Sequence, residues 1–236
     1  MNLYENIFRR KSTRKYDMSP LDGATLAEVT AFAGSLKPLH PEIKTAYQLT
    51  DNVKNIFPVK APHYFLLFSE KQDDYLENTG FMWQQMDLYL SGLGLGSCWL
   101  GMVKPSGEAK AGLSFVIALA FGKAQGSPYR EQSGFKRKAL AEISGGSDSR
   151  IEAARLAPSA NNTQSWFFDS AGGVIDVYQK NLNPAMALLY SRFNSIDMGI
   201  ALCHLCLATE HEGREFIFEK RSGKNKKGYA YTGTVK

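Results

Sequence analysis

Residues 157–166 read Ala157-Pro158-Ser159-Ala160-Asn161-Asn162-Thr163-Gln164-Ser165-Trp166, the most distinctive stretch of the chain. It follows a short helix expected over residues 149–157, which Pro158 ends because proline disfavours helix in the residue before it. An aromatic strand is expected to begin at Trp166. The small side chains let backbone amides approach a flat ligand closely, and the amide side chains offer donors and acceptors to the edge of a heterocycle. The stretch therefore predicts a ligand-binding loop, since an ordinary connection rarely contains so many hydrogen-bonding groups in succession.

The composition places this loop in a folded globular protein. The 236 residues are 44% hydrophobic and 22% charged, which excludes disordered, collagenous and disulfide-scaffold chains. No window approaches the ~18 apolar residues needed to cross a bilayer. The three cysteines are few and odd in number, and the N-terminus lacks the charged start and apolar middle of a signal peptide, so we expect a cytoplasmic protein.

The hydrophobic pattern predicts an α+β protein in which helices flank sheets. The expected helices cover residues 149–157, 81–93 and 196–210, with another after Ser19-Pro20-Leu21, where Leu26, Val29, Phe32 and Leu36 are spaced helically. The expected strands cover residues 64–68, 98–103, 115–121, 166–168, 174–178, 216–218 and 229–235. Asp169-Ser170-Ala171-Gly172-Gly173 has the composition of a hairpin turn between two of them.

The order strand, helix, glycine, strand, strand occurs twice along the chain. A shift of 117 residues places Leu88-Tyr89-Leu90-Ser91 on Leu205-Cys206-Leu207-Ala208, and it also places Gly96 on Gly213 and Trp99 on Phe216. We therefore expect one unit built from two degenerate repeats, about residues 1–140 and 141–236. Two copies of one unit would pack around a pseudo-two-fold axis, as the subunits of a homodimer do.

Basic residues are concentrated in three clusters, although the net charge is only +5. They lie in residues 9–15, 136–138 and 220–227. In the first, Arg10, Lys11, Ser12 and Arg14 can surround a phosphate with charge-assisted hydrogen bonds. Lys136 and Lys138 alternate along an extended stretch, point the same way and could close the other side of that phosphate. An exposed basic turn is an equally good interpretation, and a nucleic-acid surface is the weaker one because aromatic residues are not interleaved with the charges.

Other patterns carry no chemistry of their own. Residues 92–97 superficially resemble a dinucleotide fingerprint, but they end a helix instead of joining a strand to one. Cys203-His204-Leu205-Cys206 has metal-like spacing without a second pair of ligands, which favours core packing. No nucleophile triad or paired carboxylate emerges, so no side chain is assigned a catalytic role. A protein that borrows a cofactor for the difficult step need only bind and orient it.

Together the motifs resemble those of the nitroreductase family of flavin enzymes. Residues 10–14 match its N-terminal basic-serine motif, residues 94–101 its glycine-rich segment, and residues 157–166 its proline-serine-asparagine-glutamine-tryptophan loop. The resemblance implies a nitroreductase-like fold, FMN as cofactor and NAD(P)H as co-substrate. It also implies that Lys136 and Lys138 match the late basic pair that holds the FMN phosphate in relatives.

One departure from the family pattern bears on the architecture. The proline-serine loop usually follows the basic motif within a few dozen residues, whereas here it lies in the second half, and Lys37-Pro38-Leu39-His40-Pro41 stands near the usual place. Family dimers build each flavin site from both subunits, so a fused pseudo-dimer would keep one complete site and one degraded counterpart. This arrangement resembles a divergent tandem-repeat branch of the family and favours a monomer over a homodimer. The expected cofactor-binding residues are Arg10, Lys11, Ser12, Arg14, Trp99, Leu100, Gly101, Lys136, Lys138, Pro158, Ser159, Ala160 and Asn162.

The function expected from the resemblance is an FMN-dependent oxidoreductase. It would pass hydride from NADH or NADPH through the flavin to a nitroaromatic, a quinone or a similar small acceptor, with no nucleic acid or membrane as partner. Two alternatives remain open: a flavin-binding protein without turnover, in storage or sensing, and a basic nucleic-acid-binding module.

Overall fold

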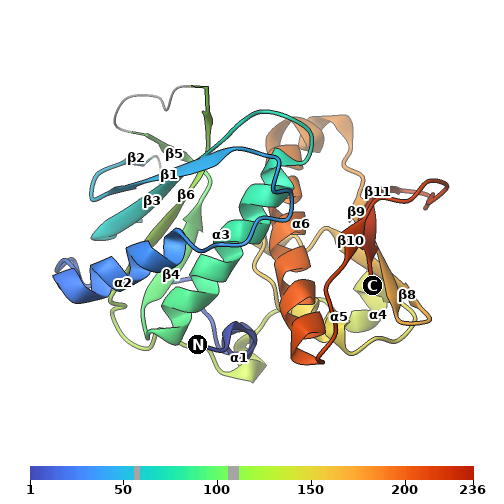
Figure 1. Cartoon of the computed structure of the whole chain (residues 1–236), viewed down its shortest axis with the longest axis horizontal. Helices are drawn as coiled ribbons and strands as arrows, with labels where there is room; N and C mark the ends of the chain where they lie inside the picture. The colour runs from blue at the N-terminus through green and yellow to red at the C-terminus, as the bar shows by residue number, and fades with distance from the viewer. Residues whose placement is uncertain (56–58, 106–111) are drawn as a thin grey trace.

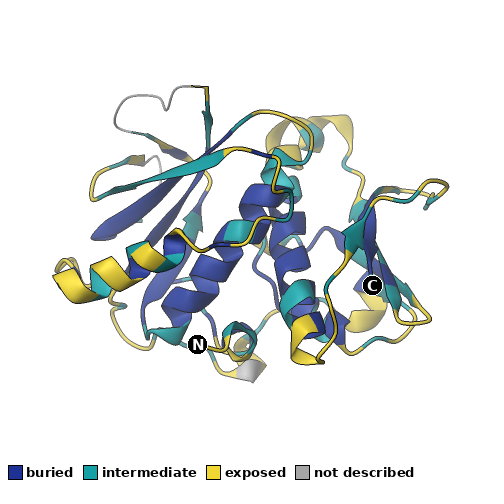
Figure 2. Ribbon diagram, viewed as in Figure 1, coloured by how far each residue is buried: buried dark blue, intermediate teal, exposed yellow. Residues whose placement is uncertain are grey.

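Two long helices, α3 (Tyr75–Gly92) and α6 (Pro184–His211), lie between two sheets (Figure 1). This arrangement comes from a computed structural model, which describes residues 1–55, 59–105 and 112–236. α3 is buried along most of its length and α6 over its central part, residues 194–209, as Figure 2 shows, because each faces a sheet and the other helix. None of the helices in the described residues is long and apolar enough to span a bilayer.

The first sheet has the strand order β1-β3-β6-β4. Its strands are β1 (Thr45–Thr50), β3 (His63–Ser69), β6 (Ser114–Gly122) and β4 (Gly96–Leu100), and every neighbouring pair is antiparallel. Along β3 the side chains alternate between two apolar clusters: Phe65 and Leu67 pack with the helices, and Leu66 and Phe68 pack on the opposite face. Both faces of β3 are therefore covered, which explains its uninterrupted apolar run.

The second sheet has the order β10-β11-β9-β8-β7. Its strands are β10 (Phe218–Glu219), β11 (Tyr229–Val235), β9 (Val174–Lys180), β8 (Trp166–Ala171) and β7 (Ser144–Gly145). The expected hairpin is confirmed as β8 and β9, joined at Gly172 and Gly173, whose φ angles of 57° and 76° require the freedom of glycine. Only β7 pairs in the parallel sense, and it joins the outer edge at β8.

The two sheets repeat one topology, which confirms the expected tandem repeat. The order β1-β3-β6-β4 corresponds strand by strand to β8-β9-β11-β10, and each neighbouring pair is antiparallel in both sheets. The central helix of each repeat follows its second strand, since α3 follows β3 and α6 follows β9. β7 is the one strand of the second sheet without a counterpart among the described strands of the first.

The crossing of α3 and α6 defines the pseudo-two-fold axis. A Cβ on Gly80 would collide with the backbone of Ile196 and lie 3.2 Å from the amide nitrogen of Ile200. In the same way, a Cβ on Gly199 would collide with the backbone of Glu77 and lie 2.8 Å from the amide nitrogen of Phe81. Each matched pair is 119 residues apart (199 − 80, 196 − 77, 200 − 81), so the contacts on the two sides are equivalent. The register at the crossing is thus two residues longer than the shift of 117 expected from sequence.

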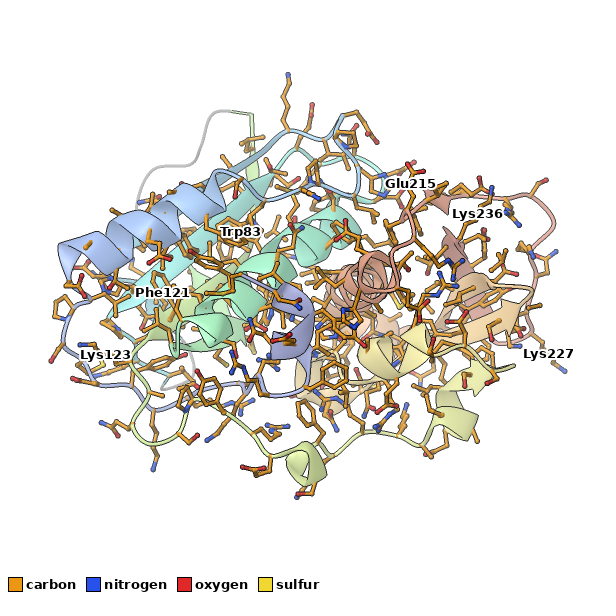
Figure 3. The ribbon with its side chains drawn as sticks, turned by 60° about the horizontal axis from the view of Figure 1, so that its bottom comes forward. Trp83, Phe121, Lys123, Glu215, Lys227 and Lys236 are labelled. Atoms are coloured by element: carbon orange, nitrogen blue, oxygen red, sulfur yellow. The ribbon has the colours of Figure 1, made fainter. Side chains whose placement is uncertain are left out.

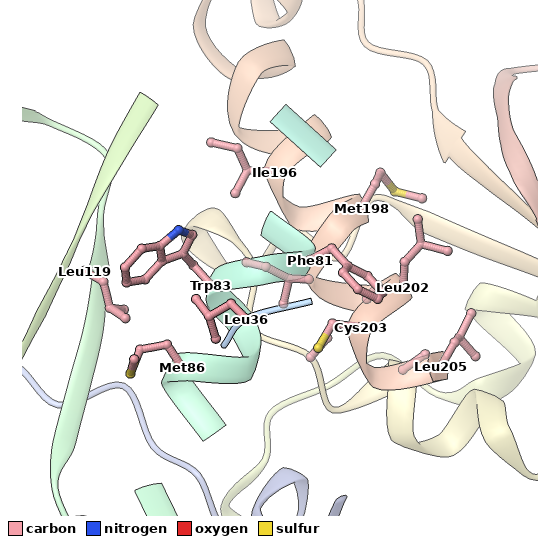
Figure 4. Close-up of a cluster of buried hydrophobic side chains, with 14 of the residues drawn as sticks. Leu36, Phe81, Trp83, Met86, Leu119, Ile196, Met198, Leu202, Cys203 and Leu205 are labelled. Atoms are coloured by element: carbon pink, nitrogen blue, oxygen red, sulfur yellow. The ribbon is translucent and has the colours of Figure 1, made fainter. Parts of the chain in front are cut away.

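One apolar cluster unites the two repeats (Figure 4). Trp83 and Met86 of α3 contribute to it from the first repeat, and Met198 and Leu202 of α6 from the second. Because the core is shared, neither repeat buries its apolar surface alone.

Several shorter elements complete the chain, and some boundaries differ from the expected ones. The shorter elements are α1 (Leu3–Ile7), α2 (Gly23–Ala33), β2 (Lys54–Asn55), β5 (Val103–Lys104), α4 (Leu140–Ile143) and α5 (Arg150–Arg155), with 3-10 turns η1 (Gln132–Gly134) and η2 (Ala160–Asn162). α2 follows Ser19-Pro20-Leu21 as expected, and it is capped by the Asp22 side chain, which accepts from the amide of Thr25. α6 begins at Pro184, twelve residues before the expected start, because Asn183 caps it and Pro184 is suited to the first turn. Leu188 in that early part is 88% exposed, so these first turns lie outside the buried core.

Candidate functional site at the junction of the repeats

The N-terminal basic motif is held against β4. Ser12 forms a parallel bridge with Ser97, and the amide of Thr13 donates to the carbonyl of Ser97 at 2.8 Å. On the other side of the motif, Arg10 bridges Tyr129 in the segment that follows β6. These backbone contacts place residues 10–14 between β4 and that segment, so their side chains are positioned by two neighbours.

A buried ion pair orients Arg10. Its Nε lies 2.8 Å from Asp87 Oδ2, and the two side chains are 2% and 0% exposed. Asp87 Oδ1 also accepts from Ser97 Oγ at 2.5 Å, and Arg10 Nη2 donates to Ser12 Oγ at 3.1 Å. A charge buried this deeply is tolerated only when it is paired and hydrogen-bonded, so Asp87 determines where the guanidinium of Arg10 points.

The network continues from Asp87 across the helix pair. Gln84 Nε2 donates to Asp87 Oδ2 at 3.0 Å and to His204 Nε2 at 3.1 Å, while Gln84 Oε1 accepts from Trp99 Nε1 at 3.3 Å. His204 Nδ1 lies 2.8 Å from the Ala153 carbonyl and is therefore the protonated nitrogen, which leaves Nε2 to accept from Gln84. The expected core position of His204 is confirmed, and it also joins α6 to the side chains that position Arg10 and Trp99.

This network predicts a pH dependence of stability. Full burial lowers the pKa of His204 to about 3, against about 6.5 in an unfolded chain. Between these values the unfolded chain binds a proton that the folded chain does not, so the free energy of unfolding falls as the pH decreases from about 6.5 toward 3. We expect His204→Gln, which cannot titrate, to show a shallower loss in urea denaturation over this range. All other titrating groups are the same in the wild type and in His204→Gln. If both proteins lost the same free energy of unfolding as the pH falls, the assignment of this loss to His204 would be contradicted.

The segment after β6 carries the second basic cluster from one repeat to the other. β6 belongs to the first sheet and β7 to the second, so residues 123–143 cross between them. Arg137 Nη1 donates to Asn162 Oδ1 at 2.6 Å, and Lys138 Nζ donates to the carbonyls of Thr163 and Gln164, each at 2.9 Å. The basic cluster and the ligand-binding loop expected from sequence are therefore in direct contact.

The loop over residues 157–166 is held in a strained conformation. Asn161, Asn162 and Gln164 have φ angles of 50°, 57° and 48°, and only one other non-glycine residue in the described chain has a positive φ. The Ser159 hydroxyl accepts from the amide of Gln164 at 3.0 Å, which closes the turn. Such conformations persist only where the surroundings impose them, and they concentrate at functional sites.

α6 contacts both the loop and the end of β4. The carboxyl oxygens of Asp197 accept from the amide of Ala160 at 3.0 and 3.2 Å. Burial raises the pKa of Asp197 well above its ordinary value. One turn earlier, the ring of Phe193 covers Gly101, where a Cβ would lie 2.9 Å from Cζ. One face of α6 thus brings Gly101 of the first repeat and Ala160 of the second to the same junction.

Four arginines share the electrostatic environment of this junction. Burial and the charges of Arg10 and Arg14 lower the pKa of Arg130. Burial, followed by the charges of Arg10 and Arg130, lowers the pKa of Arg137 to about 10. The guanidiniums of Arg130 and Arg137 both lie over the Phe135 ring, at 5.2 and 5.6 Å, and Arg137 Nε is inaccessible without a hydrogen-bond partner. Mutual repulsion of this kind is relieved by an anion, and a phosphate is the anion that planar guanidinium groups bind best.

The expected site residues fall into two groups. Contacts at the junction involve Arg10, Ser12, Trp99, Gly101, Lys138, Ser159, Ala160 and Asn162, whereas Arg14 is exposed and Pro158 is buried in the loop. Lys11 instead donates to the carbonyl of Ser127 at 3.1 Å, and the Leu100 side chain packs into the second apolar cluster. Lys136 is exposed, and only its carbonyl contacts the loop, by accepting from Asn162 Nδ2 at 2.8 Å.

The geometry of the late basic cluster differs from the expected one. Lys136 and Lys138 were expected to face a phosphate together, but Lys136 is exposed and Lys138 Nζ donates to loop carbonyls. The intervening Arg137 also donates to the loop, to Asn162 Oδ1 and to the carbonyl of Leu156, and the charge of Arg10 contributes to its lowered pKa. Alternation along an extended segment says which residues share a side, but not which side faces the ligand. The sequence did not single out Arg130, Arg137, Gln84, Asp87 and Asp197. A signal for the last three is present, since each is a polar residue within an apolar helical stretch.

The third basic cluster is neutralised locally. Its ion pairs are Lys220 with Asp74, Arg221 with Glu219, Lys224 with Asp176 and Lys226 with Asp169. Lys227 lies at the far side of the molecule from Lys123, where the crossing segment starts (Figure 3). Of the three clusters, two converge on the junction and this one does not, which weakens the nucleic-acid interpretation. Among the residues that the structure describes, no group of three or more His, Cys, Asp or Glu side chains is placed to hold a metal ion.

Comparison with known proteins defines the family. A family model described as "Putative TM nitroreductase" matches residues 2–209, and the chain therefore belongs to this nitroreductase family. A crystal structure of "a putative nitroreductase" from Thermotoga maritima superposes on 100% of this chain and 93% of its own, with a TM-score of 0.69 and 22% identity. This superposition confirms the expected α+β nitroreductase fold.

Other solved nitroreductases match a smaller part of the chain. A nitroreductase family protein from Clostridium difficile covers 60% of this chain and 96% of its own, with 20% identity and a TM-score of 0.49. A nitroreductase with bound FMN from Bacteroides fragilis covers 54% and 91%, with 17% identity and a TM-score of 0.44. No curated protein matches the sequence.

Proposed function

We propose that this protein is an FMN-dependent oxidoreductase that transfers hydride from NADH or NADPH to a nitroaromatic, a quinone or a similar small acceptor. Membership of a nitroreductase family supports the reaction class. The observation that carries the proposal is the convergence of basic side chains on the strained loop. Arg137 donates to Asn162 Oδ1 and Lys138 to the carbonyls of Thr163 and Gln164, while neighbouring arginine charges add to the burial that lowers the pKa of Arg130 and of Arg137. An anion site next to backbone amides suits a cofactor that has a phosphate at one end and a flat ring at the other.

The residues present fit such a cofactor. Arg10, Arg14, Arg130 and Arg137, with the Ser12 hydroxyl, would bind the phosphate; Arg137 Nε is buried and has no hydrogen-bond partner in the structure. The backbone of residues 99–101 and of residues 158–162 would bracket the ring. Lys138 has a supporting role, because its ammonium holds the loop carbonyls in place.

When bound, the flavin supplies the redox chemistry, and the protein's own groups orient it. No side chain is assigned as an obligate acid or base. Backbone amides at the ring edge would stabilise negative charge that develops there. Both sides of the site come from one chain, so we expect the protein to act as a monomer, which sedimentation at several concentrations would test.

A visible absorption spectrum of the purified protein, followed by anaerobic addition of NADH or NADPH, tests the proposal. A yellow protein that bleaches with either nucleotide and regains its colour with a quinone supports it. A yellow protein that does not bleach would instead be a flavin-binding protein without turnover. A colourless protein that does not take up added FMN would refute the proposal.

Replacing Arg137 tests the phosphate site directly. Arg137→Ala removes a charge-assisted contact worth about 1.5–3 kcal/mol, so we expect FMN to bind about 10- to 100-fold more weakly. Lys136→Ala is the matched control. The Lys136 side chain is exposed, so its removal should leave FMN affinity unchanged. Fluorescence quenching of FMN measures both, with urea denaturation to confirm folding. An equal loss in the two variants would contradict the assignment.

A further inference from the structure

A second cleft lies at the pseudo-symmetric counterpart of the flavin junction. It has a volume of about 440 Å³, within the usual range of small-molecule sites. Its lining comes from the loop after α2, from the central helices and from the segment after α6: Lys37, Pro38, Leu39, Phe81, Cys206, Glu210, Arg214, Glu215, Phe216 and Phe218. In Figure 1 the loop after α2 crosses in front of α3 toward α6.

The equivalence of the two places rests on matched contacts. Asn78 stands 119 residues before Asp197, the separation found at the helix crossing, and its Oδ1 accepts from the amides of Leu39 and His40 at 2.9 and 3.0 Å. Asp197 accepts in the same manner from the amide of Ala160. In both loops a proline precedes the bound amides, so the loop at Pro38 takes the position that the loop at Pro158 takes in the other repeat.

The counterpart has aromatic walls. Phe216 and Phe218 stand 117 residues after Trp99 and Gly101, the separation expected from sequence for this part of the repeat. The rings of Phe216 and Phe81 are inclined by 27°, with centroids 5.9 Å apart. Phe216 and Phe218 are only half-buried, so part of each ring is exposed in the cleft and can contact an aromatic ligand.

The counterpart lacks the phosphate-binding electrostatics. Cys206 stands 119 residues after Asp87, so no carboxylate is present there to orient an arginine. The cations of the cleft are matched by acids: Lys37 Nζ lies 3.6 Å from Glu210 Oε1, and Arg214 Nη1 lies 3.7 Å from Glu212 Oε2. Glu215 adds another carboxylate to the lining. A dianion is therefore disfavoured where an aromatic ring is accommodated.

We propose that this cleft is a second ligand site, which binds a planar aromatic molecule without a phosphate. It is the degraded partner of the flavin site: the loop and the aromatic walls persist, and the anion-binding part is lost. The inference rests on the repeat and on the cleft, and it holds whether or not the protein is an active oxidoreductase.

Riboflavin, which has the flavin ring without the phosphate, is a suitable probe. The protein is first saturated with FMN to fill the junction site, and riboflavin binding is then measured by isothermal titration calorimetry. We expect one FMN and one riboflavin per chain. Phe216→Ala should weaken riboflavin binding about tenfold and leave FMN binding unchanged, because it removes one aromatic wall.

Two further variants make the test independent of folding and of the proposed function. Cys206→Phe fills the cleft without removing a ring and should also abolish riboflavin binding. Arg137→Ala should show the reverse pattern, with weaker FMN binding and unchanged riboflavin binding. Absence of riboflavin binding, an unchanged affinity in both cleft variants, or a second FMN bound as tightly as the first would each overturn the proposal. If FMN does not bind at all, the proposed function fails. The same riboflavin titration on the isolated protein still decides whether the cleft is a ligand site.

Discussion

Gly199→Ala is expected to lower the free energy of unfolding by about 3 kcal/mol or more. A methyl group at this position would meet the backbone of Glu77, with its carbonyl carbon at 2.7 Å, and the Phe81 amide nitrogen at 2.8 Å. Backbone atoms of a central helix cannot rotate away as a side chain can, so α3 and α6 would have to separate. Because both sheets pack on this helix pair, the separation would loosen the shared core. Urea denaturation measures the loss.

The chain offers a matched control for this change. Gly23→Ala places the same methyl group at the first residue of α2, where no atom lies within 4 Å. It should change the free energy of unfolding by at most about 1 kcal/mol, in the stabilising direction. Gly80→Ala should behave like Gly199→Ala, and the double variant should cost less than the two losses added, since the helices need to separate only once. A tolerated Gly199→Ala would contradict the close crossing that defines the pseudo-two-fold axis.

Asp87→Ala is expected to destabilise the protein by about 3–5 kcal/mol, because it leaves the buried guanidinium of Arg10 without a counter-charge. It also removes the acceptor of Ser97 and Gln84. Any Asp87→Ala protein that folds should bind FMN poorly, since Arg10 is no longer oriented toward the phosphate. Thermal or urea unfolding and an FMN titration measure the two effects.

A double-mutant cycle separates the ion pair from simple loss of packing. Arg10→Met should cost much less in the Asp87→Ala background than in the wild type, because the unpaired charge is then gone. Lys220→Ala is the control: it breaks an exposed ion pair with Asp74 and should cost less than about 1 kcal/mol. Additive effects of Arg10→Met and Asp87→Ala would show that the two side chains are not coupled.

The main elements near the site were predictable because their patterns are local. The apolar run at β3, the glycine turn between β8 and β9, and the proline after α5 each dictate structure over a few residues. Motif resemblance also brought the basic segment at residues 10–14 and the loop at residues 157–166 into one proposed site. The early start of α6 was missed although Asn183 and Pro184 form a cap signal and Met186, Leu189 and Phe193 are spaced helically.

The sequence alone established the α+β class through composition, periodicity and turn residues, which act over short distances along the chain, and the tandem repeat through the order of its elements. The resemblance to nitroreductases indicated the segments that meet at the junction. Which side chains meet there depended on the tertiary structure. Arg137 rather than Lys136 has its side chain at the junction, where it donates to Asn162 Oδ1 and to the carbonyl of Leu156, while Lys136 is exposed. Likewise Asp87, Gln84 and His204 form one network only after α3 and α6 cross at two glycines. Contacts between residues about 120 positions apart arise from packing, and no local pattern encodes them.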